Sequence, residues 1–179
     1  MDGIRVNMSS KEGKSVTLEP LPSGRYLMAI TDIDLDEVSG NGGRPENKGK
    51  PMFKIELTVQ EGDYENRKAW TNVMLFDGAL YSISQMLKAQ GVEVKEIGDR
   101  AEFQVDGFES NVIPGPEWWM GKQFVCRLKL MGKRKDPKTG KEYDERSEVK
   151  GFMPAKDWKP GEGPKKGTTA TKARTSLLP

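Results

Sequence analysis

The chain has 179 residues, with 29 Lys or Arg, 27 Asp or Glu, one Cys and no His. A chain of this length fits one domain with a tail, built on one hydrophobic core. The absence of His excludes every His-dependent catalytic triad, and the single Cys excludes an intramolecular disulfide and the common zinc sites. Because no signal peptide or membrane-length apolar run is present, we expect a protein of the reducing cytoplasm that binds no membrane.

Positive charge is concentrated toward the C-terminal end of the sequence. Residues 155–179 hold six Lys or Arg against two acidic residues, a net charge of +4, so residues 1–154 carry −2. The last segment is rich in Pro, Gly, Lys and Thr, a composition that buries little apolar surface. We therefore predict a flexible arm over 1–20, a folded domain over 21–154 and a disordered basic tail over 155–179.

Three strands are predicted in the first part of the folded domain, at 24–35, 52–60 and 67–75. In the second strand, apolar residues alternate with mostly polar ones, which indicates one buried and one wet face: Phe53, Ile55, Leu57 and Val59. The third strand has Val73 on its apolar face and Lys68, Trp70 and Asn72 on the other. Between the first two strands, the Gly-rich segment 36–50 is expected to form a long, functional loop.

A helix is predicted at 78–90, capped by Asp77 and ended by Gly91. Residues 92–121 form a poorly patterned connection that ends in Trp118 and Trp119, of which at most one should face solvent. The fourth strand, 122–131, alternates between inward Phe124, Cys126, Leu128 and Leu130 and outward Val125, Arg127 and Lys129. The fifth strand is expected at about 143–153, after a hairpin loop that contains Gly140.

Three strands, one helix and two further strands are the layout of the OB-fold, a five-stranded antiparallel, partly open barrel. The fold class is therefore predicted to be mainly β. Another small barrel or a sandwich stays open, since periodicity alone does not exclude it. In an OB-fold, the ligand crosses the face of strands two and three, between the loop that joins strands one and two and the loop that joins strands four and five.

Cations and one aromatic residue occupy the predicted ligand face. Positive charge beside an outward ring suits single-stranded nucleic acid, because phosphates need cations and any base can stack on a ring. The alternative is that Trp70 covers the end of the core and that Lys68 is simply solvated. Tyr64, in the turn before the third strand, either stacks on a base or braces the turn. The candidate residues on the strands and in the two loops are Lys54, Lys68, Trp70, Asn72, Arg127, Lys129, Lys48, Lys50, Lys133, Arg134 and Lys135.

The candidate motifs for an active site or a metal site are each incomplete. Asp32, Asp34 and Asp36 share a strand face, but the calcium-loop pattern that they begin lacks its Gly and its Glu at the required positions. The Gly13-Lys14-Ser15 tripeptide looks like the end of a phosphate-binding loop, yet the first Gly of that motif is missing. We therefore expect no enzyme activity, no cofactor and no metal.

Several segments also resemble a family of small phage and prophage proteins. The resemblance covers about residues 20–154, with three motifs that match: Pro22, Gly24 and Tyr26; then Gly62, Tyr64, Arg67 and Trp70; then Gly121 and Lys122. Members of this family lie among replication and recombination genes and are regarded as single-stranded DNA-binding proteins. The resemblance implies an OB-fold, single-stranded DNA as the partner and Arg67 as a further site residue.

The sequence thus predicts a phage-type protein that protects and presents single-stranded DNA in replication or recombination, in the host cytoplasm. Phage replication and recombination proteins are further expected partners, and the oligomeric state stays open, with a dimer among the options. The alternative is a phage protein–protein adaptor that binds a polypeptide in the same groove. Salt dependence separates the two, because phosphate binding weakens steeply as salt rises.

Overall fold

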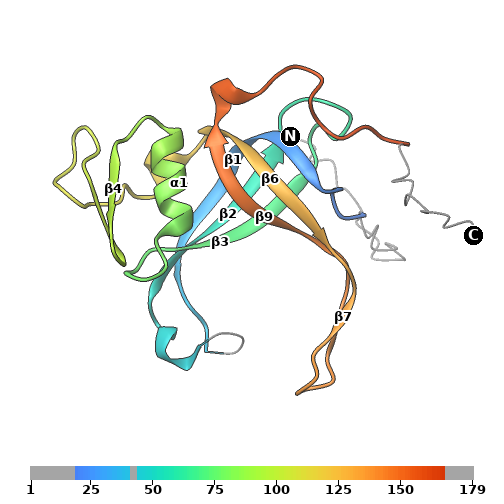
Figure 1. Cartoon of the computed structure of the whole chain (residues 1–179), viewed down its shortest axis with the longest axis horizontal. Helices are drawn as coiled ribbons and strands as arrows, with labels where there is room; N and C mark the ends of the chain where they lie inside the picture. The colour runs from blue at the N-terminus through green and yellow to red at the C-terminus, as the bar shows by residue number, and fades with distance from the viewer. Residues whose placement is uncertain (1–18, 41–43, 168–179) are drawn as a thin grey trace, which may run out of the picture.

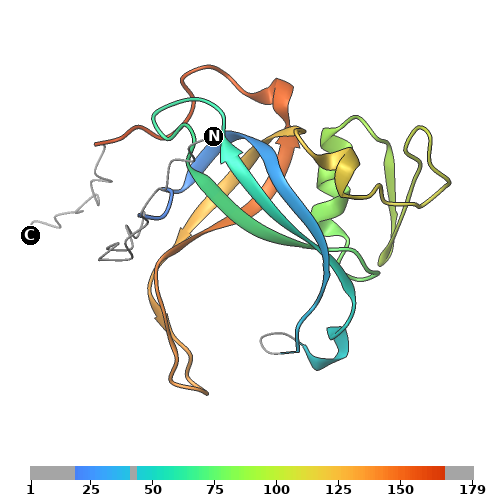
Figure 2. The same cartoon turned by 180° about the vertical axis from the view of Figure 1, so that it is seen from behind.

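Figures 1 and 2 show the computed structural model of the chain, which describes residues 19–40 and 44–167. The predicted arm, except for its last two residues, and the end of the predicted tail lie outside these ranges, as do three residues of the long loop. The prediction of a mainly β chain is confirmed. No helix in the described ranges is long and apolar enough to cross a membrane.

One five-stranded antiparallel sheet makes up most of the fold, in the order β3-β2-β1-β6-β9. Its strands are β1 (Gly24–Glu37), β2 (Pro51–Val59), β3 (Lys68–Met74), β6 (Gln123–Met131) and β9 (Arg146–Pro154). The sheet curves until its two edge strands, β3 and β9, come close to one another. These edges form no strand pair, so the sheet is not closed.

The inner face of the curved sheet and one helix form the core. The predicted apolar face of β2 is buried, and so is Val73 of β3. The predicted helix is present but shorter, as α1 (Tyr81–Ala89), and it buries Ile83 and Leu87. The α1 helix is joined to β9 because Gln85 Oε1 accepts a hydrogen bond of 3.0 Å from the Phe152 backbone N–H.

Residues 92–121 contain regular structure that the sequence analysis did not predict. A two-stranded hairpin of β4 (Val94–Ile97) and β5 (Arg100–Phe103) stands beside α1, and α2 (Pro116–Trp119) follows it. Trp119 is fully buried, and its indole N–H donates to the Pro114 carbonyl at 3.0 Å. Trp118 is half-buried and packs edge-on against Trp119, so the expectation that at most one of the pair faces solvent is confirmed.

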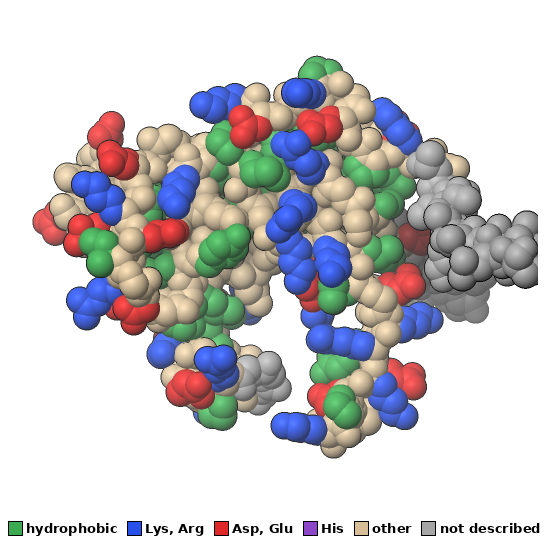
Figure 3. Space-filling view, viewed as in Figure 1, with side chains coloured by type: hydrophobic (Ala, Val, Ile, Leu, Met, Phe, Trp, Pro, Cys, Tyr) green, Lys and Arg blue, Asp and Glu red, His purple; other side chains and the backbone are tan. Residues whose placement is uncertain are grey.

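Two projections extend beyond the sheet. The first is the segment between β1 and β2, which includes the 3-10 helix η1 (Pro45–Asn47). The second is the extension of β6 and β9 into a small hairpin of β7 (Arg134–Lys135) and β8 (Glu142–Tyr143). Figures 1 and 3 show the two projections standing apart on the same side of the molecule, with open space between them.

The alternation predicted for the fourth strand is wrong at two positions. Val125 was expected to face outward, but it is fully buried. It lies outside the main core cluster, and β6 is contacted by the 3-10 helix η2 (Ala155–Asp157), which follows β9. Leu130 was expected inward, but it is 37% exposed where β6 continues toward the projecting hairpin.

The disorder predicted from residue 155 onward is wrong for residues 155–166, because 155–157 form η2 and the residues that follow lie against the folded domain. We call residues 158–166 the C-terminal strap. Glu162 forms an ion pair with Arg25 of β1, and the Trp158 indole N–H donates to the carboxylate of Glu61. The Lys166 backbone N–H donates to Asp63 Oδ2 at 2.9 Å. The C-terminal strap therefore lies across the start of β1 and the β2–β3 turn.

Candidate nucleic-acid interface

Trp70 lies on the outer face of β3, as the sequence predicted. Its side chain is 64% exposed, whereas the neighbouring Ala69 and Val73 are buried. Lys68 and Asn72 share its exposed face, because alternate residues of a strand point to the same side. An exposed indole does not gain the free energy that burial in the core would provide. The interpretation of Trp70 as a cover for the end of the core is therefore wrong.

A hollow lies on each side of Trp70, and both are bounded by the first half of β9. The larger is a groove of about 950 Å³, and the smaller has a volume of about 440 Å³. We call the two together the seam groove, because they follow the line where β3 and β9 face each other without pairing. Their lining includes Lys68, Trp70, Asn72, Lys133, Arg146 and Ser147.

The charge of the seam groove is mixed. Lys68 is bound to Glu56 of β2, with 2.7 Å between Nζ and Oε1. Hydrogen bonds from Lys68 and Thr31 hold the pKa of Glu56 below its usual value. Glu19, Asp144 and Glu145 also line the groove. The groove thus offers cations and a ring, with carboxylates between them.

Arg146 is a candidate residue that the sequence analysis missed. It lines both hollows opposite Trp70, although the two residues are 76 positions apart in the sequence. Glu148 holds its guanidinium in place, with 3.0 Å from Nε and 2.6 Å from Nη2 to Oε1. A period-2 pattern shows which residues of a strand share a face but not which distant strand lies next to it. No local signal could have found this pair.

Lys54 and Asn72 lie opposite each other on β2 and β3, outside the larger hollow. Lys54 forms an ion pair with Asp36. That contact, together with the Glu37 backbone N–H, holds the pKa of Asp36 below its usual value. The outer face of β2 therefore supplies little uncompensated positive charge.

Tyr64 and Arg67 have structural contacts in the turn before β3. The Tyr64 ring packs edge-on against buried Tyr26, with 6.2 Å between ring centroids, and Lys166 Nζ lies 5.6 Å from the Tyr64 ring centre. Of the two alternatives for Tyr64, these contacts favour bracing the turn. Arg67 lines the larger hollow, as a site residue should, and it also donates to the backbone carbonyl of Glu19.

Most of the loop cations lie on the two projections rather than at Trp70. Lys50 donates to Asn47 Oδ1 at 3.1 Å, and Lys48 is exposed. Arg134 stacks on Tyr143, with 5.0 Å between the guanidinium carbon and the ring centre. Exposed Lys135 lies on the same hairpin. Of the loop cations that were predicted, Lys133 alone is among the residues that line the larger hollow.

Arg127 and Lys129 are exposed on β6, as predicted, but they do not line the seam groove. They border a different hollow, of about 680 Å³, which also includes Arg25 and Lys150. The structure thus divides the predicted site into two surfaces. One has the exposed ring and the other has the denser positive charge.

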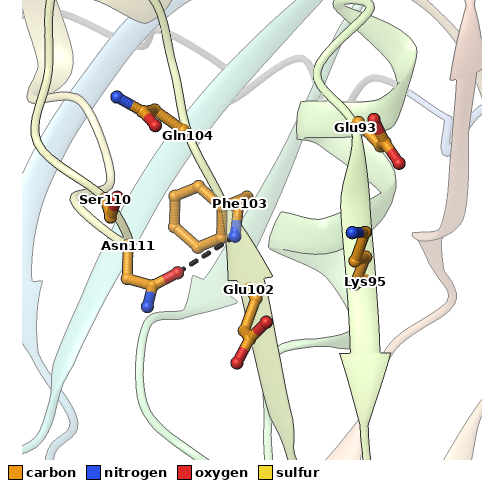
Figure 4. A pocket seen from close by; sticks show the side chains of 7 residues that line it. All are labelled: Glu93, Lys95, Glu102, Phe103, Gln104, Ser110 and Asn111. Carbon is orange, nitrogen blue, oxygen red and sulfur yellow. Dashed lines mark hydrogen bonds between the residues drawn. The ribbon is translucent and has the colours of Figure 1, made fainter.

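A further hollow lies on the β4–β5 hairpin, and Figure 4 shows its lining. The Phe103 backbone N–H donates to Asn111 Oδ1 at 3.0 Å. Asn111 has a φ of 62°, a left-handed conformation that Asn tolerates better than most residues. Its side chain therefore serves to fix the turn. The other side chains that line this hollow are Glu93, Lys95, Glu102, Gln104 and Ser110.

No activated nucleophile or metal-binding cluster is found in the described part of the chain. Cys126 is fully buried, and burial raises the pKa of its thiol far above the usual value. A thiol in that state is inert, as expected for a core residue. Within the described ranges, no three His, Cys, Asp or Glu side chains are grouped to hold a metal ion.

No model of a known protein family matches the sequence, and a search of curated proteins found none that is similar.

Proposed function

We propose that this protein binds single-stranded DNA in the seam groove, with Trp70 as the ring on which a base stacks. The observation that carries the proposal is the position of Trp70, which is 64% exposed and lies between two hollows opposite Arg146. A stacked ring with cations beside it suits any base sequence, because every base has a flat face and every nucleotide a phosphate.

We propose further that the fold is an OB-type barrel left open at one seam. The strand order β3-β2-β1-β6-β9 and the position of α1 between β3 and β6 support this assignment. So does the approach of β3 to β9, which are the first and last strands of the sheet order. In such a fold, ligands bind on the face that includes the second and third strands.

The proposed mechanism is passive. Binding keeps exposed DNA strands from folding on themselves and covers them against nucleases. The likeness of the Gly62–Trp70 motif to phage proteins supports a role in replication or recombination, with other replication or recombination proteins as further partners. This role needs no catalytic residue and no cofactor.

Intrinsic fluorescence combined with labelled DNA tests the proposal. Wild type, Trp70→Phe and Trp70→Ala are titrated with oligo-dT, with a duplex and with RNA of equal length. We expect single strands to quench Trp fluorescence and to bind more tightly than duplex, whose bases are already stacked on one another. In Trp70→Phe, most of the quenching should disappear while the affinity, followed by anisotropy of the labelled strand, is largely kept.

Trp118→Phe is the matched control, because Trp118 is half-buried away from the seam groove and should leave the quenching in place. Equal affinity for duplex and single strand would contradict the proposal and leave only a generic basic surface. Comparison of oligo-dT with RNA decides which nucleic acid is preferred.

The second candidate function, binding of a polypeptide, is favoured by the free edges of the sheet. β3 and β9 each pair on one side only, and an extended peptide can add to such an edge through backbone hydrogen bonds. The mixed charge of the seam groove suits a peptide as well. A steep fall of affinity with salt supports DNA, whereas binding that changes little with salt supports the peptide.

A further inference from the structure

The hollow between β1, β6 and β9 is strongly positively charged. Four cations line it, from three strands: Arg25, Arg127, Lys129 and Lys150. No acidic residue is among its lining residues. Figure 3 shows Lys and Arg side chains gathered over β6 and β9 on this face of the molecule. We call it the β1–β6–β9 hollow.

Two of its four cations are not neutralised. The side chains of Arg127 and Lys129 are exposed, and neither has an ion pair or hydrogen bond with a described residue. Like charges brought together raise each other's energy, so a cluster of this kind has a stability cost unless an anion binds. The hollow is thus suited to an anionic ligand.

One carboxylate already lies at the edge of this hollow. Glu162 of the C-terminal strap binds Arg25 through Nη1, whereas Arg25 Nε is buried without an acceptor. The Nε–H donor of Arg25 is therefore without a partner. A guanidinium can bind an anion through two nitrogen atoms at once. The contact shows that an anionic group fits at Arg25.

A row of side chains on β9 connects this hollow to the seam groove. Arg146, Glu148 and Lys150 follow one another along β9, and Lys150 lies where the register with β6 shifts. Glu148 binds both neighbours, with Oε1 to Arg146 and with Oε2 to Lys150 Nζ at 2.6 Å. Arg146 borders the seam groove and Lys150 borders the β1–β6–β9 hollow, about 13 Å further along the strand.

We propose that the β1–β6–β9 hollow is a second phosphate-binding site for the same DNA strand, which crosses β9 after it leaves Trp70. The inference rests on the proposed function and adds the route of the strand. Bases stack at the seam groove, and phosphates are held further along by Arg127, Lys129 and Arg25. Glu148 keeps the two cations of β9 at a fixed separation between the two sites.

Length dependence tests this route. The double variant Arg127→Ala with Lys129→Ala is titrated with oligo-dT of increasing length, across the range of about 4–16 nucleotides that one OB-type domain binds. The shortest strands, bound at the seam groove alone, should show wild-type affinity. Longer strands should bind roughly tenfold more weakly at low salt, with a salt slope smaller by about 1.4 for two lost phosphate contacts.

The matched control is the double variant Lys95→Ala with Arg100→Ala, which removes the same charge from the exposed β4–β5 hairpin. A loss that is equal at all lengths, or no greater than in the control, would overturn the second site while wild type still prefers single strands. If wild type shows no such preference, the proposed function itself fails, and the second site fails with it. Circular dichroism of each variant confirms that it is folded.

Discussion

Trp70 lies directly opposite Glu56 in the register of β2 and β3, and the same carboxylate binds Lys68 at 2.7 Å. The exposed ring is thus bordered by a negative charge. Hydrogen bonds from Lys68, from Thr31 and from Trp70 itself hold the pKa of Glu56 below its usual value, so it stays ionised at neutral pH. A base that stacks on Trp70 brings its phosphates close to this carboxylate.

Replacement of Glu56 by Gln should therefore strengthen the binding of single-stranded DNA. It removes one repulsive charge and releases Lys68 for a phosphate, a gain of up to about 1 kcal/mol, or fivefold, for exposed charges. The measurement is anisotropy of labelled oligo-dT. Asp99→Asn, an exposed acid on the β4–β5 turn, controls for net charge. If both variants gain the same affinity, the effect comes from net charge and not from the position of Glu56.

Trp70 and Val73 separate binding from stability within one strand. Trp70→Ala should weaken single-strand affinity by about 1–3 kcal/mol, the range for one stacked base, with little change in melting temperature. Val73 is 1% exposed, so Val73→Ala should lower the free energy of unfolding by about 2 kcal/mol through lost burial and a cavity. Below its melting point, this variant should bind like wild type. An unchanged affinity of Trp70→Ala would exclude the seam groove as the stacking site.

Tyr64 is expected to act on stability rather than on DNA binding. Its edge-on contact with Tyr26 is lost in Tyr64→Ala, which should reduce the free energy of unfolding by about 1–3 kcal/mol. Tyr81→Ala is a suitable control, because Tyr81 is 67% exposed at the start of α1. If Tyr64→Ala has normal stability and weaker DNA binding, Tyr64 belongs to the DNA-binding site instead.

The sequence was informative wherever a local pattern decides the structure. Alternation in residues 52–60 and 67–75 predicted two strands and the exposed face of Trp70, and helical spacing predicted α1. The β4 and β5 strands were missed because each has only four residues, too few to establish an apolar period, and five of the eight are exposed. Val125 was misassigned because a period-2 pattern does not show which elements cover the outer face of β6, which η2 contacts.

The candidate site was predictable only in part, because a local pattern does not show which distant strands lie side by side. Trp70 and Lys68 share one strand, so alternation places them together. The position of Arg146 beside them depends on how far the whole sheet curves, which no local pattern gives. The same holds for Arg25 and Lys150, which join Arg127 and Lys129 only because β1 and β9 flank β6.

The contacts of the C-terminal strap predict a difference between two truncated chains. A chain that ends at Gly167 keeps the bonds from the strap to Arg25, Glu61 and Asp63, whereas a chain that ends at Asp157 loses all three. The shorter chain should be less stable than the longer by about 1–3 kcal/mol, from exposed hydrogen bonds and one ion pair. Thermal melts of the two chains measure this difference. Identical melting temperatures would show that the strap contributes nothing to the fold.

Glu162 makes the C-terminal strap a competitor for DNA at Arg25. In Glu162→Gln, the strap loses its negative charge, so Arg25 is free to bind a phosphate. Long oligo-dT should bind a few-fold more tightly, because the strand gains one phosphate contact. The same contact should raise the salt slope by about 0.7. The shortest strands, which do not reach Arg25, should show no gain.

Asp157→Asn is the control for this last variant, because it removes the same charge from an exposed residue just before the C-terminal strap. Affinity is followed by anisotropy at several salt concentrations, with a thermal melt to confirm that the strap still stabilises the fold. If Asp157→Asn gives the same gain, net charge alone is responsible. If Glu162→Gln improves short and long strands equally, Arg25 belongs to the seam groove and not to a second site.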